Sequence, residues 1–238
     1  MKKFLLCGAV VFALSVFAAA GCFAQEDMSA DKPDAAQTAF ADALASASRQ
    51  KTMTQFWNLV HPDSVACLSD EFKAVSELIN FGDTIKTPIP ADYKAMVGPI
   101  DPQEVTEFFT TIFGADVKIP VMPTHALALI YDENAGICKA ATVNKMIYIA
   151  EKDGKWYEAM PCPATLPMTA TDLKSKIDAD EKAAAERFAA LTPELKEELR
   201  KELTGDGGKI AAVKKAAAAQ GLKFAEAKSV VEKLCREK

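Results

Sequence analysis

Residues 124–160, THALALIYDENAGICKAATVNKMIYIAEKDGKWYEAM, decide the fold of this chain, because apolar and polar side chains alternate over most of their length. Alternation with a period of two is typical of strands that bury one face. Asp153-Gly154 stands between two such segments and is a strong signal for a tight hairpin turn. The strands predicted from this pattern cover residues 124–132, 137–152 and 155–160. The stretch therefore predicts an antiparallel sheet.

The turns fix an expected register for these strands. Lys152 is expected opposite Lys155, and Asp132 opposite Ile137. Alternation then assigns each side chain to a face, and a bulge in the long strand would exchange part of this assignment. One face is predicted to hold His125, Leu127, Leu129, Tyr131, Thr142, Asn144, Met146, Tyr148 and Tyr157. The other face is predicted to hold Ile130, Val143, Ile147, Ile149, Trp156 and Met160.

Apolar residues recur at helical spacing ahead of the sheet. The helices predicted there cover 34 onward, 53–60, 71–80 and 102–113. Asp34 and Asp101 are good capping residues for the first and last of them. Pro62 is expected to end the second helix, because the residue before a proline is disfavoured in helical angles. Residues 81–102 are rich in proline and glycine and predict loops with one short strand, and 117–121 predicts another short strand.

The composition changes after Cys162 to Ala, Lys and Glu, which predicts helices alone. These helices are expected from Thr171, from Thr192-Pro193, from Lys209 and from Phe224. We therefore expect an α+β fold, with N-terminal helices packed on a curved, cone-like antiparallel sheet, followed by an all-helical C-terminal tail. The predicted boundaries are 1–24 for a signal peptide, 25–33 for a tether, 34–165 for the α+β domain and 170–238 for the helical region.

The first residues have the pattern of an export signal. Lys2 and Lys3 are followed by an uncharged apolar run from Phe4 to Ala20 and then by small residues. This order is typical of a secretory signal peptide. The pattern predicts export to the periplasm or cell envelope; an uncleaved N-terminal anchor is the other interpretation of the same run.

Two processing sites compete after this run. Cys22-Phe23-Ala24 ahead of Gln25 suits an ordinary signal peptidase. Ala19-Ala20-Gly21-Cys22 resembles a lipobox, in which Cys22 would carry a lipid, although Ala19 stands where the motif usually has Leu. The first site predicts a soluble exported protein, and the second predicts a membrane contact through a lipid anchor at Cys22.

Four further cysteines would remain in the exported chain as disulfide candidates: Cys67, Cys138, Cys162 and Cys235. They can form two bridges in three ways, or stay as buried thiols. The expected register places Cys138 and Cys162 far apart, which argues against a bridge between them. None is spaced as CxxC and the two histidines lie far apart, so we expect no metal and no cofactor. A net charge of −5 with no basic stretch before the C-terminal region argues against nucleic-acid binding.

The order of helices and strands resembles the nuclear transport factor 2-like superfamily, which includes ketosteroid-isomerase-like and SnoaL-like proteins. The resemblance covers about residues 34–162, with the proline-rich 81–102 as a departure. The matching features are the helix with Phe40 and Leu44, the segment 57–62, the helix 103–113 and the hairpin 151–157. This resemblance implies a cone that often holds an apolar pocket. Members include isomerases and hydrolases, and also exported domains without known chemistry.

The last thirty residues are similar to the helix-turn-helix of the C-terminal domain of the bacterial ribosomal stalk protein. The matching positions are Lys209-Ile210-Ala211, Lys214, Gly221-Leu222, Glu226-Ala227-Lys228 and Val231-Glu232. The resemblance implies a helical hairpin that contacts other proteins. The resemblance covers the helix-turn-helix of that domain and none of its strands.

We expect from these features non-catalytic binding of a small apolar ligand or a protein partner. The predicted pocket lining is His125, Leu127, Leu129, Tyr131, Asn144 and Tyr148. The alternative is an isomerase or hydrolase in which His125 titrates near neutrality and Tyr148 or Tyr157 donates to a developing oxyanion. A third hypothesis is a structural lipoprotein anchored at Cys22.

Overall fold

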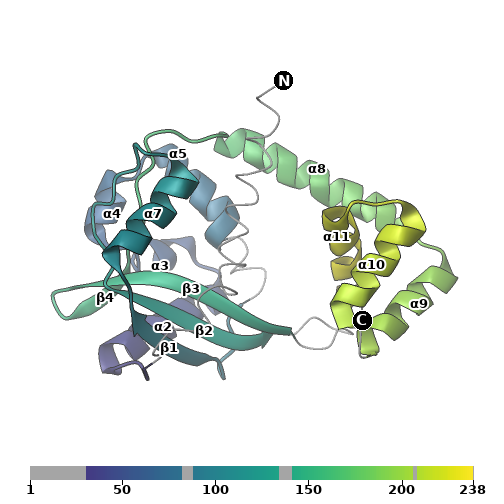
Figure 1. Cartoon of the computed structure of the whole chain (residues 1–238), viewed down its shortest axis with the longest axis horizontal. Coiled ribbons are helices and arrows are strands. Elements are labelled where there is room, and N and C mark those ends of the chain that lie inside the picture. Colours follow the sequence, from purple (N-terminus) through teal and green to yellow (C-terminus); the bar gives the residue numbers. More distant parts are fainter. Residues whose placement is uncertain (1–30, 82–87, 134–140, 206–207, 238) are drawn as a thin grey trace. The chain divides into compact units, whose positions relative to one another are not determined.

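The computed structural model describes residues 31–81, 88–133, 141–205 and 208–237. The described residues form two compact units. The first takes those among 31–131 and 143–170, and the second takes those among 132–142 and 171–237. Each unit is considered by itself below (Figure 1).

The first unit combines helices with one four-stranded antiparallel sheet of order β1-β2-β3-β4. Its helices are α2 (Ala35–Gln50), α3 (Met53–Trp57), α4 (Pro62–Cys67), α5 (Asp70–Ser76), the π-helical turn η2 (Glu77–Phe81) and α7 (Pro102–Phe113). Its strands are β1 (Lys94–Pro99), β2 (His125–Glu133), β3 (Ala141–Lys152) and β4 (Lys155–Glu158). The predicted α+β class is confirmed.

Helix α2 begins where the sequence predicted, at a reciprocal capping box. The side chain of Asp34 accepts from the backbone N–H of Gln37 at 2.7 Å, and the side chain of Gln37 accepts from the N–H of Asp34 at 2.9 Å. These two bonds satisfy donors that the first turn leaves free. The helix buries Phe40 and Leu44 in the first core.

The segment around His61 differs from the prediction. Helix α3 already ends at Trp57, and His61 caps a further helix, α4, that was not predicted. Pro62 occupies the first position of α4. A proline disfavours helical angles for the residue before it but fits the first turn of a helix, so Pro62, which was expected to end a helix, starts one instead.

Two short strands were predicted between α5 and β2, and one of them forms. Strand β1 arises within the proline-rich stretch and pairs with β2, from Lys94 opposite Ile130 to Pro99 opposite His125. The predicted strand 117–121 is reduced to a single bridge between Lys118 and Cys162.

The hairpin of β3 and β4 has the predicted register, with Lys152 opposite Lys155 and Ala150 opposite Tyr157. Asp153 and Gly154 both have positive φ, 56° and 76°. Positive φ at both central residues is the geometry that Asp-Gly turns favour.

The assignment of β3 side chains to the faces of the sheet was wrong. Leu127 and Leu129 of β2 are buried in one cluster with Ile147 and Ile149 of β3. The ring of His125 likewise meets Trp156, at 5.1 Å between centroids, although these residues were predicted on opposite faces. A shift of one residue between strands exchanges the faces. The observed arrangement places Leu127 and Leu129 in one core with Ile147 and Ile149. The predicted pairing of Asp132 with Ile137 lies outside the described residues.

Apart from the strand ends at 132–133 and 141–142, the second unit is formed by helices. They are α8 (Ala170–Ala189, whose first residue belongs to the first unit), α9 (Pro193–Thr204), α10 (Gly208–Gln220) and α11 (Phe224–Arg236). Its core is built on the fully buried Leu199, Leu203, Val230, Val231 and Leu234. Within the described ranges, no helix combines the length and apolar character that crossing a membrane requires.

Candidate functional site

The three residues predicted for catalysis do not meet in one site. Tyr148 contacts the rings of Phe108 and Phe109 on α7, at 5.8 and 5.6 Å between centroids. Burial, and then the charge of Glu104, raises the pKa of the Tyr148 hydroxyl. Since Tyr148 lies between Ile147 and Ile149 on β3, it points to the face opposite theirs.

His125 and Tyr157 have other neighbours. The Nδ1 atom of His125 lies 3.0 Å from the hydroxyl of Thr124, and its ring meets Trp156. Tyr157 meets the ring of His61 edge to face at 5.6 Å. A histidine and a tyrosine that share a reacting atom must both reach it within hydrogen-bond distance, and these two residues face different partners.

Three of the six residues predicted to line a pocket lie in the core. Leu127, Leu129 and Tyr131 are buried in the first cluster. Asn144 belongs to β3. Cys22 and Cys138, named for lipidation and for a disulfide, lie outside the described residues.

Two of the predicted disulfide candidates are joined to each other. Cys67 at the end of α4 is bonded to Cys162 beyond β4, with 6.0 Å between the Cα atoms and a sequence separation of 95. The backbone of Cys162 also bonds with that of Lys118 in both directions, at 3.0 and 2.8 Å. Cys235 is disulfide-bonded as well.

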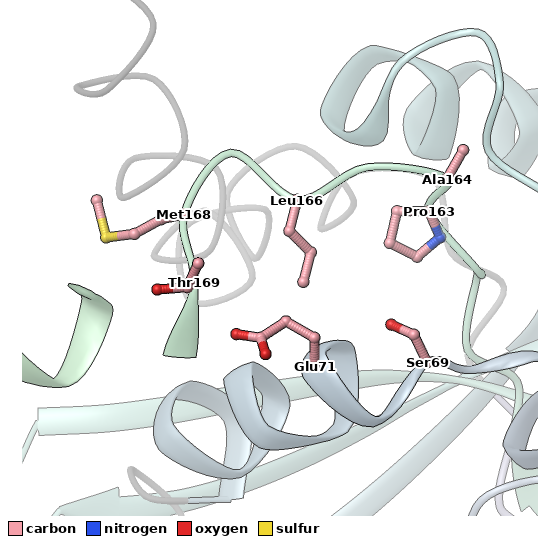
Figure 2. Close-up of a pocket in the computed structure, with 7 residues that line it drawn as sticks. All are labelled: Ser69, Glu71, Pro163, Ala164, Leu166, Met168 and Thr169. Carbon is pink, nitrogen blue, oxygen red and sulfur yellow. The ribbon is translucent and has the colours of Figure 1, made fainter. Parts of the chain in front are cut away.

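A surface pocket of about 290 Å³ opens next to the Cys67–Cys162 bond, between the start of α5 and the segment that leads to α8. Its lining consists of Ser69, Glu71, Pro163, Ala164, Leu166, Met168 and Thr169. Figure 2 shows Leu166 and Pro163 reaching from that segment toward Glu71 and Ser69. The pocket therefore has an apolar wall above a carboxylate and a hydroxyl.

Sequence reasoning missed this pocket. Ser69 and Glu71 have the pattern of a helix start, and Ser69 does accept from the N–H of Phe72. Nothing in the local sequence relates them to residues 163–169, which lie more than ninety positions away. Only the pairing of Cys67 with Cys162 would have indicated their proximity.

The hairpin of α10 and α11 presents a second candidate surface. The described residues include three large hydrophobic side chains that are exposed, and two of them lie here: Ile210 is 64% exposed and Phe224 is 55% exposed. The third, Met122, is 38% exposed. Ile210 lies in the first turn of α10 and Phe224 is the first residue of α11, so each helix of the hairpin exposes one large apolar side chain.

This hairpin, residues 208–236, is also strongly basic, with seven Lys or Arg and two Glu. Both glutamates are already engaged. Glu226 pairs with Arg187 of α8 at 2.7 Å, and Glu232 pairs with Lys209 at 3.1 Å. The exposed Lys214 and Lys228 lie on the same two helices as Ile210 and Phe224, so the hairpin combines apolar side chains with excess positive charge.

In the part of the chain that the structure describes, no group of three or more His, Cys, Asp or Glu side chains is placed to hold a metal ion. Comparison of the chain with protein-family models, with curated proteins and with solved structures finds no match in any of the three.

Proposed function

We propose that this protein is exported and acts outside the cytoplasm as a non-catalytic binding protein, which holds an acidic protein partner on its α10–α11 hairpin. The observation that carries the proposal is the exposure of Ile210 and Phe224 on a helix pair with an excess of lysine.

Two independent features support action outside the cytoplasm. The first is the N-terminal pattern of Lys2 and Lys3, an apolar run and small residues. The second is the bond between Cys67 and Cys162. Disulfides persist in oxidising compartments and are rare where glutathione keeps thiols reduced. The N-terminal pattern and the disulfide come from different parts of the chain, and both support action outside the cytoplasm.

The chemistry of the hairpin selects the partner. Phe224 and Ile210 expose apolar area to water, and covering it is favourable by about 25 cal/mol per Å². The two glutamates of the hairpin are paired within the unit, Glu232 also with Lys228 at 3.9 Å. Seven basic side chains against two Glu still leave an excess of positive charge, and the exposed Lys214 and Lys228 present part of it to the carboxylates of a partner. Complementary charge of this kind steers association and fixes orientation. A segment that alternates acidic and apolar side chains fits both requirements.

Photo-crosslinking from the hairpin tests this proposal. Phe224 is replaced by p-benzoylphenylalanine, which preserves the aromatic ring, in the cells that naturally make the protein. We expect one protein adduct, whose yield falls several-fold when Lys214→Glu and Lys228→Glu are added. The matched control carries the photoreactive residue at the exposed Gln103 of α7 and should not give this adduct.

Three outcomes contradict the proposal. They are adducts with lipid alone, the same adduct from position 103, and a yield that charge reversal leaves unchanged. Export is tested separately by the mass of the mature protein. A chain that starts at Gln25, or a lipid mass on Cys22, supports export, whereas an intact Met1 leader in the purified cellular protein argues against it.

A further inference from the structure

The segment 163–169 forms one wall of the pocket beside the Cys67–Cys162 bond, and this segment is held in place at both ends. The segment 163–169 begins directly after Cys162, which is bonded covalently to α4. It ends at Ala170, whose backbone N–H donates to the carboxylate of Glu71. A site held in this way loses little conformational freedom when a ligand enters, and pre-organisation of this kind favours binding.

The seven residues that line this pocket include a single charged side chain. Glu71 alone is ionisable among its seven residues, and the hydrogen bond that it receives comes from a neutral backbone group. The hydroxyl of Ser69 lies on the same side of the pocket, while Leu166 and Pro163 form the opposite wall (Figure 2). A ligand that matches this lining needs a positive end and an apolar body.

We propose that this pocket binds a small aliphatic amine, whose ammonium group contacts Glu71 and Ser69 and whose alkyl chain packs on Leu166 and Pro163. A charge-assisted hydrogen bond from ammonium to carboxylate is stronger than a neutral one. The volume of about 290 Å³ lies at the lower end of the range for ligand pockets, about 300–1,000 Å³, which suits a short chain. This site is independent of the hairpin surface.

Titration of the full-length protein with n-hexylamine tests the proposal. Binding is followed by calorimetry and by the methyl resonance of Met168 after labelling of methionine methyl groups. We expect hexylamine to bind at least tenfold more tightly than hexan-1-ol, which has the same chain without the charge. We also expect it to shift the resonance of Met168 more than those of the other methionines.

Two variants separate the charge from the fold. Glu71→Gln keeps an acceptor for the N–H of Ala170 but removes the charge, and should weaken hexylamine binding at least tenfold. Asp70→Asn removes the neighbouring charge, which faces Lys73, and should leave the affinity within twofold. Leu166→Ala should weaken binding several-fold and provides a second test if Glu71→Gln does not fold.

The proposal is overturned if hexan-1-ol binds as well as hexylamine, or if Glu71→Gln leaves the affinity for hexylamine unchanged. Equal shifts at all methionines would also overturn it, because they would indicate non-specific association. The crosslinking result on the hairpin does not bear on any of these outcomes.

Discussion

At the scale of single residues, His61 combines several roles in one buried position. Its side chain is 3% exposed, and its Nδ1 accepts from the backbone N–H of Asp63 at 3.2 Å, which caps α4. Burial lowers the pKa of His61; the charge of Asp63 opposes this, and that of Lys152 adds to it. The folded unit therefore favours the neutral ring, which alone can accept at Nδ1.

This setting predicts a pH dependence of stability. The unfolded chain binds a proton at His61 near its ordinary pKa of 6.5, whereas the folded unit binds it only at lower pH. The contribution of His61 is therefore complete above pH 6.5 and is lost as the pH falls through 6.5 toward the folded value. We expect the urea midpoint, followed by tryptophan fluorescence, to fall between pH 7.5 and 5.5.

The matched control is His61→Asn, since asparagine also caps helices well but does not titrate. Glu158 acts in the opposite direction, because burial raises its pKa and favours the protonated, folded form as the pH falls. The difference between the wild type and His61→Asn isolates the histidine. An identical pH profile for both proteins would refute its role.

The Cys67–Cys162 bond predicts a large loss of stability on removal. It closes a loop with a sequence separation of 95, and loss of such a bond typically costs about 2–5 kcal/mol, more for longer loops. We expect the double variant Cys67→Ser/Cys162→Ser to lower the free energy of unfolding of the first unit by this amount. If it unfolds at the same urea concentration as the oxidised wild type, the bond contributes nothing.

At the scale of elements, α7 contacts Tyr148 of the sheet through two aromatic side chains, Phe108 and Phe109. Phe109 is fully buried and meets Tyr148 of β3 as well as Phe108 and Phe113 of its own helix. Phe109→Ala leaves a cavity, and we expect a loss of about 3–5 kcal/mol. Thr106→Ala, on the exposed side of α7, is the matched control and should change the midpoint little. Equal effects of the two would show that α7 does not depend on this contact.

The elements also show why some boundaries could be predicted. Asp34, Asp101 and Thr192 all accept a hydrogen bond from the first turn of the helix that they precede. Capping uses neighbours in the chain, so the sequence contains all the information needed. Helix α4 and strand β1 were harder, because the proline that was expected to end a helix starts α4 instead, and β1 exists through its pairing with β2.

At the scale of the whole molecule, the residues that the structure describes form two hydrophobic cores. The first buries α2 and α3 against β2 and β3, and the second is confined to residues from Leu191 onward, with Phe188 packed against it. Both tryptophans, Trp57 and Trp156, and all four tyrosines belong to the first unit. Tryptophan fluorescence therefore reports on one unit, while helical circular dichroism reports on both.

This arrangement predicts that the two units respond independently to substitution. Leu234 is fully buried in the second core, and Leu234→Ala should cost that unit about 2–5 kcal/mol. We expect an earlier transition by circular dichroism and an unchanged midpoint by tryptophan fluorescence. Phe109→Ala is the reciprocal control, since it should move the fluorescence transition. A shift of both signals with Leu234→Ala would mean that the units unfold together.

The sequence by itself determined what depends on neighbours in the chain. It determined the capped starts of α2, α7 and α9, the Asp153-Gly154 turn with the register of β3 and β4, and the α+β class. Periodicity and caps act over a few residues, so no knowledge of distant segments was needed. The export signal and the hairpin resemblance have the same local character and stay predictions.

Only the tertiary structure decided which distant residues meet. Ile147 and Ile149 are buried in one cluster with Leu127 and Leu129, whereas the predicted register had placed the two pairs on opposite faces of the sheet. This packing also places His125 and Tyr148 on opposite faces. The bond of Cys67 to Cys162 brought Glu71 to residues 163–169 and so created the pocket. Alternation along a strand allows either set of side chains to face the core, and four cysteines allow three pairings. The packing of the whole core selects one arrangement in each case.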